Sequence, residues 1–176
     1  RTIKSYMQLL ERRYSDKLDA DGQEFIQFAM DGSARMDILL QDLLDYSRIG
    51  RSGLQPTKLD MNDFLAKVLR NLDRQISDTD AKVVIEHLPG SYGYESEIYL
   101  LFQNLVSNGI KFHHTDRRPE GVVSVKQEDD YYIFGISDNG IGIPVEFEET
   151  IFTIFQRLHS RKVYEGTGIG LAICKK

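Results

Sequence analysis

The chain has 176 residues, 41% hydrophobic and 28% charged, so it can bury a core and is neither disordered nor membrane-spanning in composition. Its formal charge is −5 with scattered basic residues, which argues against nucleic-acid binding because a phosphate backbone requires a positive surface. The single cysteine, Cys174, excludes an internal disulfide and a thiolate metal cluster within one chain. No apolar run approaches the roughly 18 residues that cross a bilayer, so we expect no membrane contact from this chain.

The first fifty residues are predicted to form two amphipathic helices. Apolar residues recur every three or four positions over 3–18 and again over 25–49, as one face of a helix requires. The stretch SDKLDADG between them is rich in turn formers, and Asp19 or Asp21 is the candidate cap of the second helix. Such a hairpin cannot enclose a core alone. Pairing with a second copy would complete a four-helix bundle, and packing on the rest of the same chain is an equally weighted alternative.

A linker and a third helix are predicted next. Gly50 and Gly53 can end the second helix, and residues 51–59 show no sustained pattern, which is typical of a linker. Residues 60–77 regain helical spacing, with Asp60 as the candidate cap.

The remaining pattern mixes strands and helices. Residues 82–88 are β-branched and predict a strand, and residues 89–94 predict a turn. An apolar helix is predicted over 96–112, followed by strands over 121–127 and 131–138. This mixture favours an α+β two-layer sandwich.

The segment NLVSNGIKF carries two carboxamides and a lysine on one helix face. Asn104 and Asn108 lie four residues apart, and Lys111 lies three residues further on. Carboxamides in an apolar helix need partners, and a magnesium ion that also binds phosphate oxygens would be one. Helix capping or hydrogen bonding between helices is the commoner explanation of this motif taken alone.

The segment DNGIGIP follows the last predicted strand. Asp138 would lie at the strand end, and Gly140 and Gly142 would let the backbone turn closely beneath a ligand. A carboxylate there can accept a hydrogen bond from the amine of adenine, whereas guanine presents an acceptor and is rejected. A simple Asp-Asn-Gly turn is the alternative.

The segment GTGIGLAI is a second glycine-rich loop. Gly166, Gly168 and Gly170 at a helix start would present backbone N–H groups to an anion such as phosphate. The preceding residues HSRKVYE do not form a buried strand, and the spacing is GxGxG, so a dinucleotide-binding motif is not favoured.

The segment IFTIFQRL joins the two loops. Phe152 and Phe155 are predicted to anchor a short helix over 151–158, and the polar residues after it predict a lid. Arg157 could reach phosphate, although an exposed arginine is more often solvated.

In this order and spacing, the four segments resemble the N, G1, F and G2 boxes of the catalytic ATP-binding domain of sensor histidine kinases, members of the GHKL ATPase group. The first two helices resemble the dimerisation and histidine-phosphotransfer hairpin, and DGSARMDILLQDLLDYSRIG resembles the phytochrome-type subgroup. The resemblance implies a hairpin over 1–50 (a four-helix bundle in the dimer), a linker over 51–59, and an α+β two-layer sandwich of the GHKL type over 60–176.

The resemblance also implies residue roles. Asn108 resembles the magnesium ligand, and Asn104 the residue that positions the γ-phosphate. Lys111 resembles a phosphate-contacting lysine, and Asp138 the aspartate that recognises adenine. The other implied nucleotide contacts come from the two glycine-rich loops and the end of the F box: Gly140, Gly142, Arg157, Gly166, Thr167, Gly168, Gly170 and Leu171.

The implied activity is in-line transfer of the ATP γ-phosphoryl group, with Mg²⁺, to a hairpin histidine, for relay to a response regulator. We expect a cytoplasmic homodimer whose catalytic domain and hairpin each lack a terminal piece. RTIKSYM resembles the stretch after the phosphoacceptor histidine, and no histidine lies in residues 1–50. The alternatives are a GHKL-type ATPase, which usually has a glutamate where Asn104 stands, and a nucleotide-binding scaffold without kinase activity.

Overall fold

The computed structural model of the chain describes residues 2–50, 55–160 and 163–176. It divides after Ser47 into two compact units, the first entirely helical and the second built from helices and strands. The predicted order, a helical part followed by an α+β sandwich, is confirmed. None of the helices in the described part of the chain combines the length and apolar character that a membrane crossing needs.

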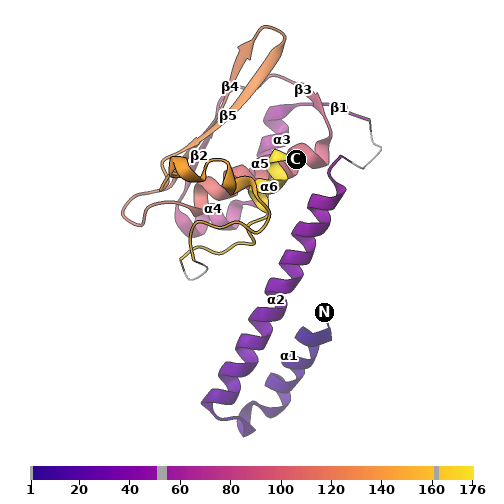
Figure 1. Cartoon of the computed structure of the whole chain (residues 1–176), viewed down its shortest axis with the longest axis vertical. Coiled ribbons are helices and arrows are strands. Elements are labelled where there is room, and N and C mark those ends of the chain that lie inside the picture. Colours follow the sequence, from indigo (N-terminus) through magenta and orange to yellow (C-terminus); the bar gives the residue numbers. More distant parts are fainter. Residues whose placement is uncertain (1, 51–54, 161–162) are drawn as a thin grey trace. The chain divides into compact units, whose positions relative to one another are not determined.

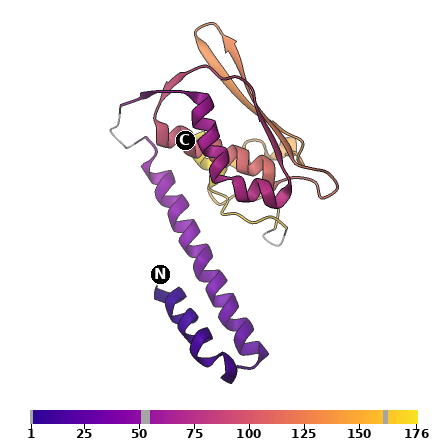
Figure 2. The same cartoon turned by 180° about the vertical axis from the view of Figure 1, so that it is seen from behind.

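The first unit is a helical hairpin. Helices α1 (Thr2–Tyr14) and α2 (Ala20–Arg48) lie side by side and antiparallel (Figures 1 and 2). Asp19 is the cap of α2, because its Oδ1 accepts a hydrogen bond from the N–H of Gly22 at 2.8 Å. Gly50 has a φ of +74° just after α2, as expected of a residue that ends a helix, and Gly53 lies outside the described residues.

The hairpin does not bury its own apolar stripe. Among its described residues only Ser33 is buried. The exposed large apolar side chains of the two helices are Ile3, Tyr6, Leu9, Leu10, Tyr14, Phe25, Phe28, Met36, Ile38, Leu40, Leu43 and Leu44. Two helices thus leave a broad apolar face without a core, as their sequence predicts.

The second unit contains two small sheets. Strands β1 (Thr57–Leu59) and β3 (Ser91–Gly93) pair antiparallel. Strand β4 (Glu120–Glu128) lies between β2 (Lys82–Ile85), with which it is parallel, and β5 (Tyr131–Asp138), with which it is antiparallel. The turn between β4 and β5 extends beyond the helices in both views (Figures 1 and 2).

Strands β1 and β3 differ from the sequence prediction. The first lies in the segment 51–59 that was predicted to be a linker, and the second in the predicted turn 89–94. Each strand has three residues, too few for an alternating pattern, and each is stabilised by backbone hydrogen bonds to the other.

The helices of the second unit lie on one face of the three-stranded sheet (Figures 1 and 2). They are α3 (Met61–Asn71), α4 (Asp73–Thr79), α5 (Glu95–Lys111) and the short α6 (Gly170–Lys175). The sheet with one helical layer forms the predicted two-layer sandwich.

The predicted helix over 60–77 begins as expected but is interrupted at Leu72, between α3 and α4. Asp60 caps α3, because its carboxylate accepts hydrogen bonds from the backbone N–H groups of Asn62 at 3.0 Å and Asp63 at 3.2 Å. These bonds, that from Asp63 foremost, hold the pKa of the Asp60 carboxyl below its ordinary value.

The core lies between the helices and the three-stranded sheet. Phe64 of α3, Phe102 of α5 and Phe134 of β5 meet edge to face, with ring centres 6.4 and 6.0 Å apart. On α5 the buried residues are Phe102, Val106 and Ile110, each four residues after the last. This apolar face fixes the rotation of α5 and therefore directs Asn104 and Asn108 away from the core.

Candidate functional site

The polar face of α5 carries the predicted carboxamides and lysine. Asn104 donates a hydrogen bond from Nδ2 to the carbonyl of Leu100 at 2.8 Å. The side chain of Asn108 has no hydrogen-bond partner among the described residues, so its oxygen is available to a ligand. The ammonium of Lys111 lies 4.3 Å from the centre of the Phe112 ring.

The second glycine-rich loop lies against this face of α5. A Cβ built on Gly170 would fall 2.6 Å from Oδ1 of Asn104, and one built on Gly166 would fall 3.1 Å from Nζ of Lys111. Asn108 lies between Asn104 and Lys111 on the same helix face. The structure therefore brings together two motifs that are more than fifty residues apart in sequence.

Gly168 lets the loop pass close to the preceding backbone. Its φ is +77°, and a Cβ there would fall 2.7 Å from the carbonyl oxygen of Gln156 and 2.9 Å from the carbonyl carbon of Phe155. The N–H of Phe155 donates to the carbonyl of Gly168 at 2.9 Å. A side chain at this position is excluded both by φ and by space.

The loop leads directly into α6. Oγ1 of Thr167 accepts a hydrogen bond from the N–H of Ile169 at 3.3 Å, and Ile169 is fully buried. Leu171 follows in the first turn of α6 and is half-buried. Further along, burial raises the pKa of the Cys174 thiol to about 11, so the single cysteine is a neutral packing residue.

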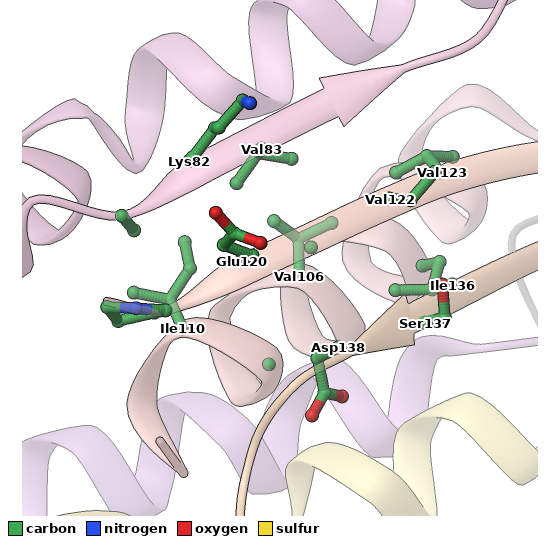
Figure 3. Close-up of a pocket in the computed structure, with 14 residues that line it drawn as sticks. Lys82, Val83, Val106, Ile110, Glu120, Val122, Val123, Ile136, Ser137 and Asp138 are labelled. Carbon is green, nitrogen blue, oxygen red and sulfur yellow. The ribbon is translucent and has the colours of Figure 1, made fainter. Parts of the chain in front are cut away.

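Asp138 lies at the end of β5, as predicted (Figure 3). Its Oδ1 accepts a hydrogen bond from the N–H of Gly140 at 2.8 Å. Its Oδ2 accepts none among the described residues. A Cβ built on Gly109 would fall 3.5 Å from this Oδ2 and 3.3 Å from Cβ of Asp138, so the carboxylate lies directly against α5.

A narrow apolar cavity adjoins Asp138, between α5 and the three-stranded sheet (Figure 3). Val106 and Ile110 of α5 line it together with Val123 and Ile136 of the strands. Asp138 lies at the edge of this cavity, and its carboxylate points away from the apolar side chains (Figure 3).

The first glycine-rich loop is fixed to the end of α5. The N–H of Ile141 donates to the carbonyl of Phe112 at 2.9 Å. A Cβ on Gly140 would fall 2.4 Å from that carbonyl oxygen, whereas a Cβ on Gly142 would meet nothing within 4 Å. Gly140 thus permits a close backbone approach.

The segment between the loops differs from its prediction. The helix expected over 151–158 is a single 3₁₀ turn, Thr150–Phe152. Phe155 has a φ of +66°, which no helix tolerates, because its backbone turns to meet Gly168. Phe155 is also 58% exposed, so the prediction that it anchors the segment is wrong.

Arg157 binds the backbone of the segment that follows it. Its Nη2 donates to the carbonyl of Tyr164 at 2.6 Å, and its Nη1 donates to the carbonyl of Gly166. Its contact with phosphate stays a prediction.

Tyr164 is a site residue that was not predicted from the sequence. Its hydroxyl donates to the carbonyl of His113 at 3.1 Å, and its ring packs on Phe112 and His159. An aromatic residue in the mostly polar stretch HSRKVYEG was the available signal.

Part of this chain matches a known protein family, and the whole chain is similar to known sensor proteins. Residues 93–176 match the family described as histidine kinase-, DNA gyrase B-, and HSP90-like ATPase. The chain is 41% identical over 174 residues to the phytochrome-like protein Cph1 of Synechocystis. The aligned region covers 99% of this chain and 23% of Cph1. It is 28% identical to the sensor protein kinase WalK of Staphylococcus haemolyticus over 99% of this chain and 29% of WalK. The chain thus spans about a quarter of the length of these relatives.

Solved structures agree in fold. Full-length ShkA in complex with AMPPNP superposes with a TM-score of 0.69 at 20% identity, over 97% of this chain and 36% of ShkA. The histidine kinase ThkA, in complex with the response regulator protein TrrA, superposes with a TM-score of 0.63 at 17% identity, over 90% of this chain and 48% of that one. Residues 93–176 therefore carry a domain of the histidine kinase-, DNA gyrase B-, and HSP90-like ATPase family, and the whole chain is similar to one segment of phytochrome-like and sensor kinase proteins.

Proposed function

We propose that this chain binds Mg-ATP and is the kinase core of a two-component sensor. In the parent protein it would transfer the γ-phosphoryl group to a hairpin histidine, for relay to an aspartate of a response regulator. The observation that carries the proposal is the convergence of three elements at the end of α5: its polar face, the second glycine-rich loop, and Asp138.

The base would be recognised by Asp138. Because Oδ1 is engaged by the N–H of Gly140, Oδ2 is the oxygen available to the exocyclic amine of adenine. A guanine carbonyl at the same place would face a second acceptor.

The phosphates would lie between α5 and the second glycine-rich loop. Lys111 would balance their charge, and the N–H groups at the start of α6 would face them. Asn108 fits a magnesium ligand because its carboxamide is unpaired among the described residues. Bound Mg²⁺ supplies charge neutralisation on the phosphate oxygens. Asn104, beside Gly170, would fix the position of the γ-phosphate. The contribution of the chain to catalysis is therefore positioning.

Two partners follow from the same proposal. The exposed apolar stripe of the hairpin supports homodimerisation into a four-helix bundle, because a face this broad needs a second helical pair. The response regulator is proposed from the family and from the complex of ThkA with TrrA. The cytoplasmic location and the division at residues 51–59 stay predictions.

Replacing Asp138 with asparagine tests the nucleotide site. The carboxamide oxygen can keep the hydrogen bond from Gly140, which leaves an NH₂ group facing the base. We expect weaker ATP binding and a ratio of ATP to GTP affinity that falls at least about tenfold, because a donor then faces the adenine amine but suits the guanine carbonyl.

Titration of the 176-residue chain with each nucleotide, followed by calorimetry, measures this ratio. Asp130→Asn is the matched control, since it removes one carboxylate from the exposed turn between β4 and β5. An unchanged ratio in Asp138→Asn would refute the assignment of the base site. Steady ATP hydrolysis by the chain that Asn104→Ala abolishes would favour the ATPase alternative instead.

A further inference from the structure

Tyr164 is packed against the end of α5, although it belongs to the segment before the second glycine-rich loop. Its ring centre lies 5.0 Å from that of Phe112 and 5.4 Å from that of His159. Its hydroxyl donates a hydrogen bond to the carbonyl of His113 at 3.1 Å, in a partly buried position. One side chain thus joins the segment to α5 by both packing and a polar contact.

The backbone of the same residue is held from the other side. The carbonyls of Tyr164 and Gly166 both accept hydrogen bonds from the guanidinium of Arg157. A planar guanidinium bonded to two carbonyls fixes their relative orientation. Residues 164–166 are therefore held by two sets of contacts. The side chain of Tyr164 contacts the end of α5, and Arg157 binds the backbone carbonyls from the preceding segment.

These contacts fix the position of the start of the second glycine-rich loop relative to α5. A Cβ on Gly166 would lie 3.1 Å from Nζ of Lys111, so the start of the loop and the predicted phosphate-binding lysine are adjacent. Phe112, on which Tyr164 packs, also accepts the hydrogen bond from Ile141 of the first loop. The end of α5 is thus the common support of both loops.

We infer that Tyr164 is a positioning residue for the polyphosphate of the nucleotide. Its hydroxyl holds the start of the second glycine-rich loop beside Lys111 before the nucleotide binds, so less conformational entropy is lost on binding. This inference rests on the proposed nucleotide site. The hydroxyl should therefore affect the binding of the phosphates and leave the binding of the base unchanged, because the proposed base site is Asp138, beside the other loop.

Tyr164→Phe tests the hydroxyl, since the ring and its packing remain. Losing one net hydrogen bond should weaken ATP binding about three- to tenfold and leave adenosine binding unchanged. Both affinities are measured on the 176-residue chain by calorimetry. Tyr132→Phe, on β5 and 44% exposed, is the matched control and should leave both affinities as in the unaltered chain.

The outcomes separate the two proposals. If the unaltered chain fails to bind ATP, the proposed function is wrong. If it binds ATP and Tyr164→Phe binds equally well, or loses ATP and adenosine affinity equally, the positioning role is wrong. A measurement on the unaltered chain is independent of any variant: the backbone order parameter of Gly166 without nucleotide should approach the rigid value of about 0.85, and a value below about 0.6 would overturn the inference.

Discussion

Replacing Gly168 with alanine should damage the nucleotide site while the second unit stays folded. The added Cβ would lie 2.7 and 2.9 Å from two backbone atoms of Gln156 and Phe155. Neither atom can move as the end of a flexible side chain would. The loop must therefore shift away from residues 155–156 or abandon its conformation.

The magnitude follows from two terms. A positive φ costs an alanine about 1–2 kcal/mol, and forcing a methyl group into an occupied space costs about 1–3 kcal/mol. The loop can avoid most of this cost by releasing the hydrogen bond between Phe155 and Gly168, worth about 1 kcal/mol. The N–H groups that we propose as phosphate donors are then displaced, so a loss of at least ~2 kcal/mol, about 30-fold, is expected in ATP affinity.

The assay is ATP titration together with thermal denaturation. Because the strain can be relieved by local opening, the melting temperature should fall less than for a core truncation such as Leu65→Ala. Gly50→Ala is the matched control: its φ is +74° but a Cβ there meets nothing within 4 Å. It should leave ATP affinity unchanged. Normal ATP binding by Gly168→Ala, or an equal loss in Gly50→Ala, would refute the reasoning.

Two further substitutions test the support of the site and the start of α3. Gly109→Ala gains about 1 kcal/mol of helix propensity but places a Cβ 3.3 Å from that of Asp138. We expect unchanged or slightly raised stability against denaturant, and an ATP affinity that is a few-fold lower. An unchanged ATP affinity would contradict the close contact between Gly109 and Asp138. Asp60→Ala should lower the melting temperature at neutral pH, since it removes the cap of α3. The folded-state pKa of Asp60 is below its ordinary 3.8, so this stabilisation is complete above that value and is lost as pH falls through the lowered pKa. The difference between the two proteins should therefore shrink below pH 3.8, and a gap that persists in acid would disprove the carboxylate cap.

The sequence predicted what local periodicity and local chemistry determine. The apolar spacing of Phe102, Val106 and Ile110 is enough to rotate Asn104 and Asn108 away from the core, and the cap of α3 by Asp60 depends only on the three residues that follow it. Strands β1 and β3 could not be predicted in the same way, since each acquires its hydrogen bonds from the other, more than thirty residues away.

The same distinction explains why the segment between the glycine-rich loops was predicted as a helix. Its apolar residues have helical spacing, but the backbone of Phe155 has a positive φ where it donates to Gly168, and Arg157 reaches carbonyls seven and nine residues ahead. Each of these contacts ends on a backbone group, and backbone groups leave little trace in side-chain patterns. The glycines did carry a signal, because a position where a Cβ would collide must be glycine whatever its neighbours are. In this site the sequence alone therefore locates tertiary contacts at the glycines where an added Cβ would collide with another segment, namely Gly140, Gly168 and Gly170.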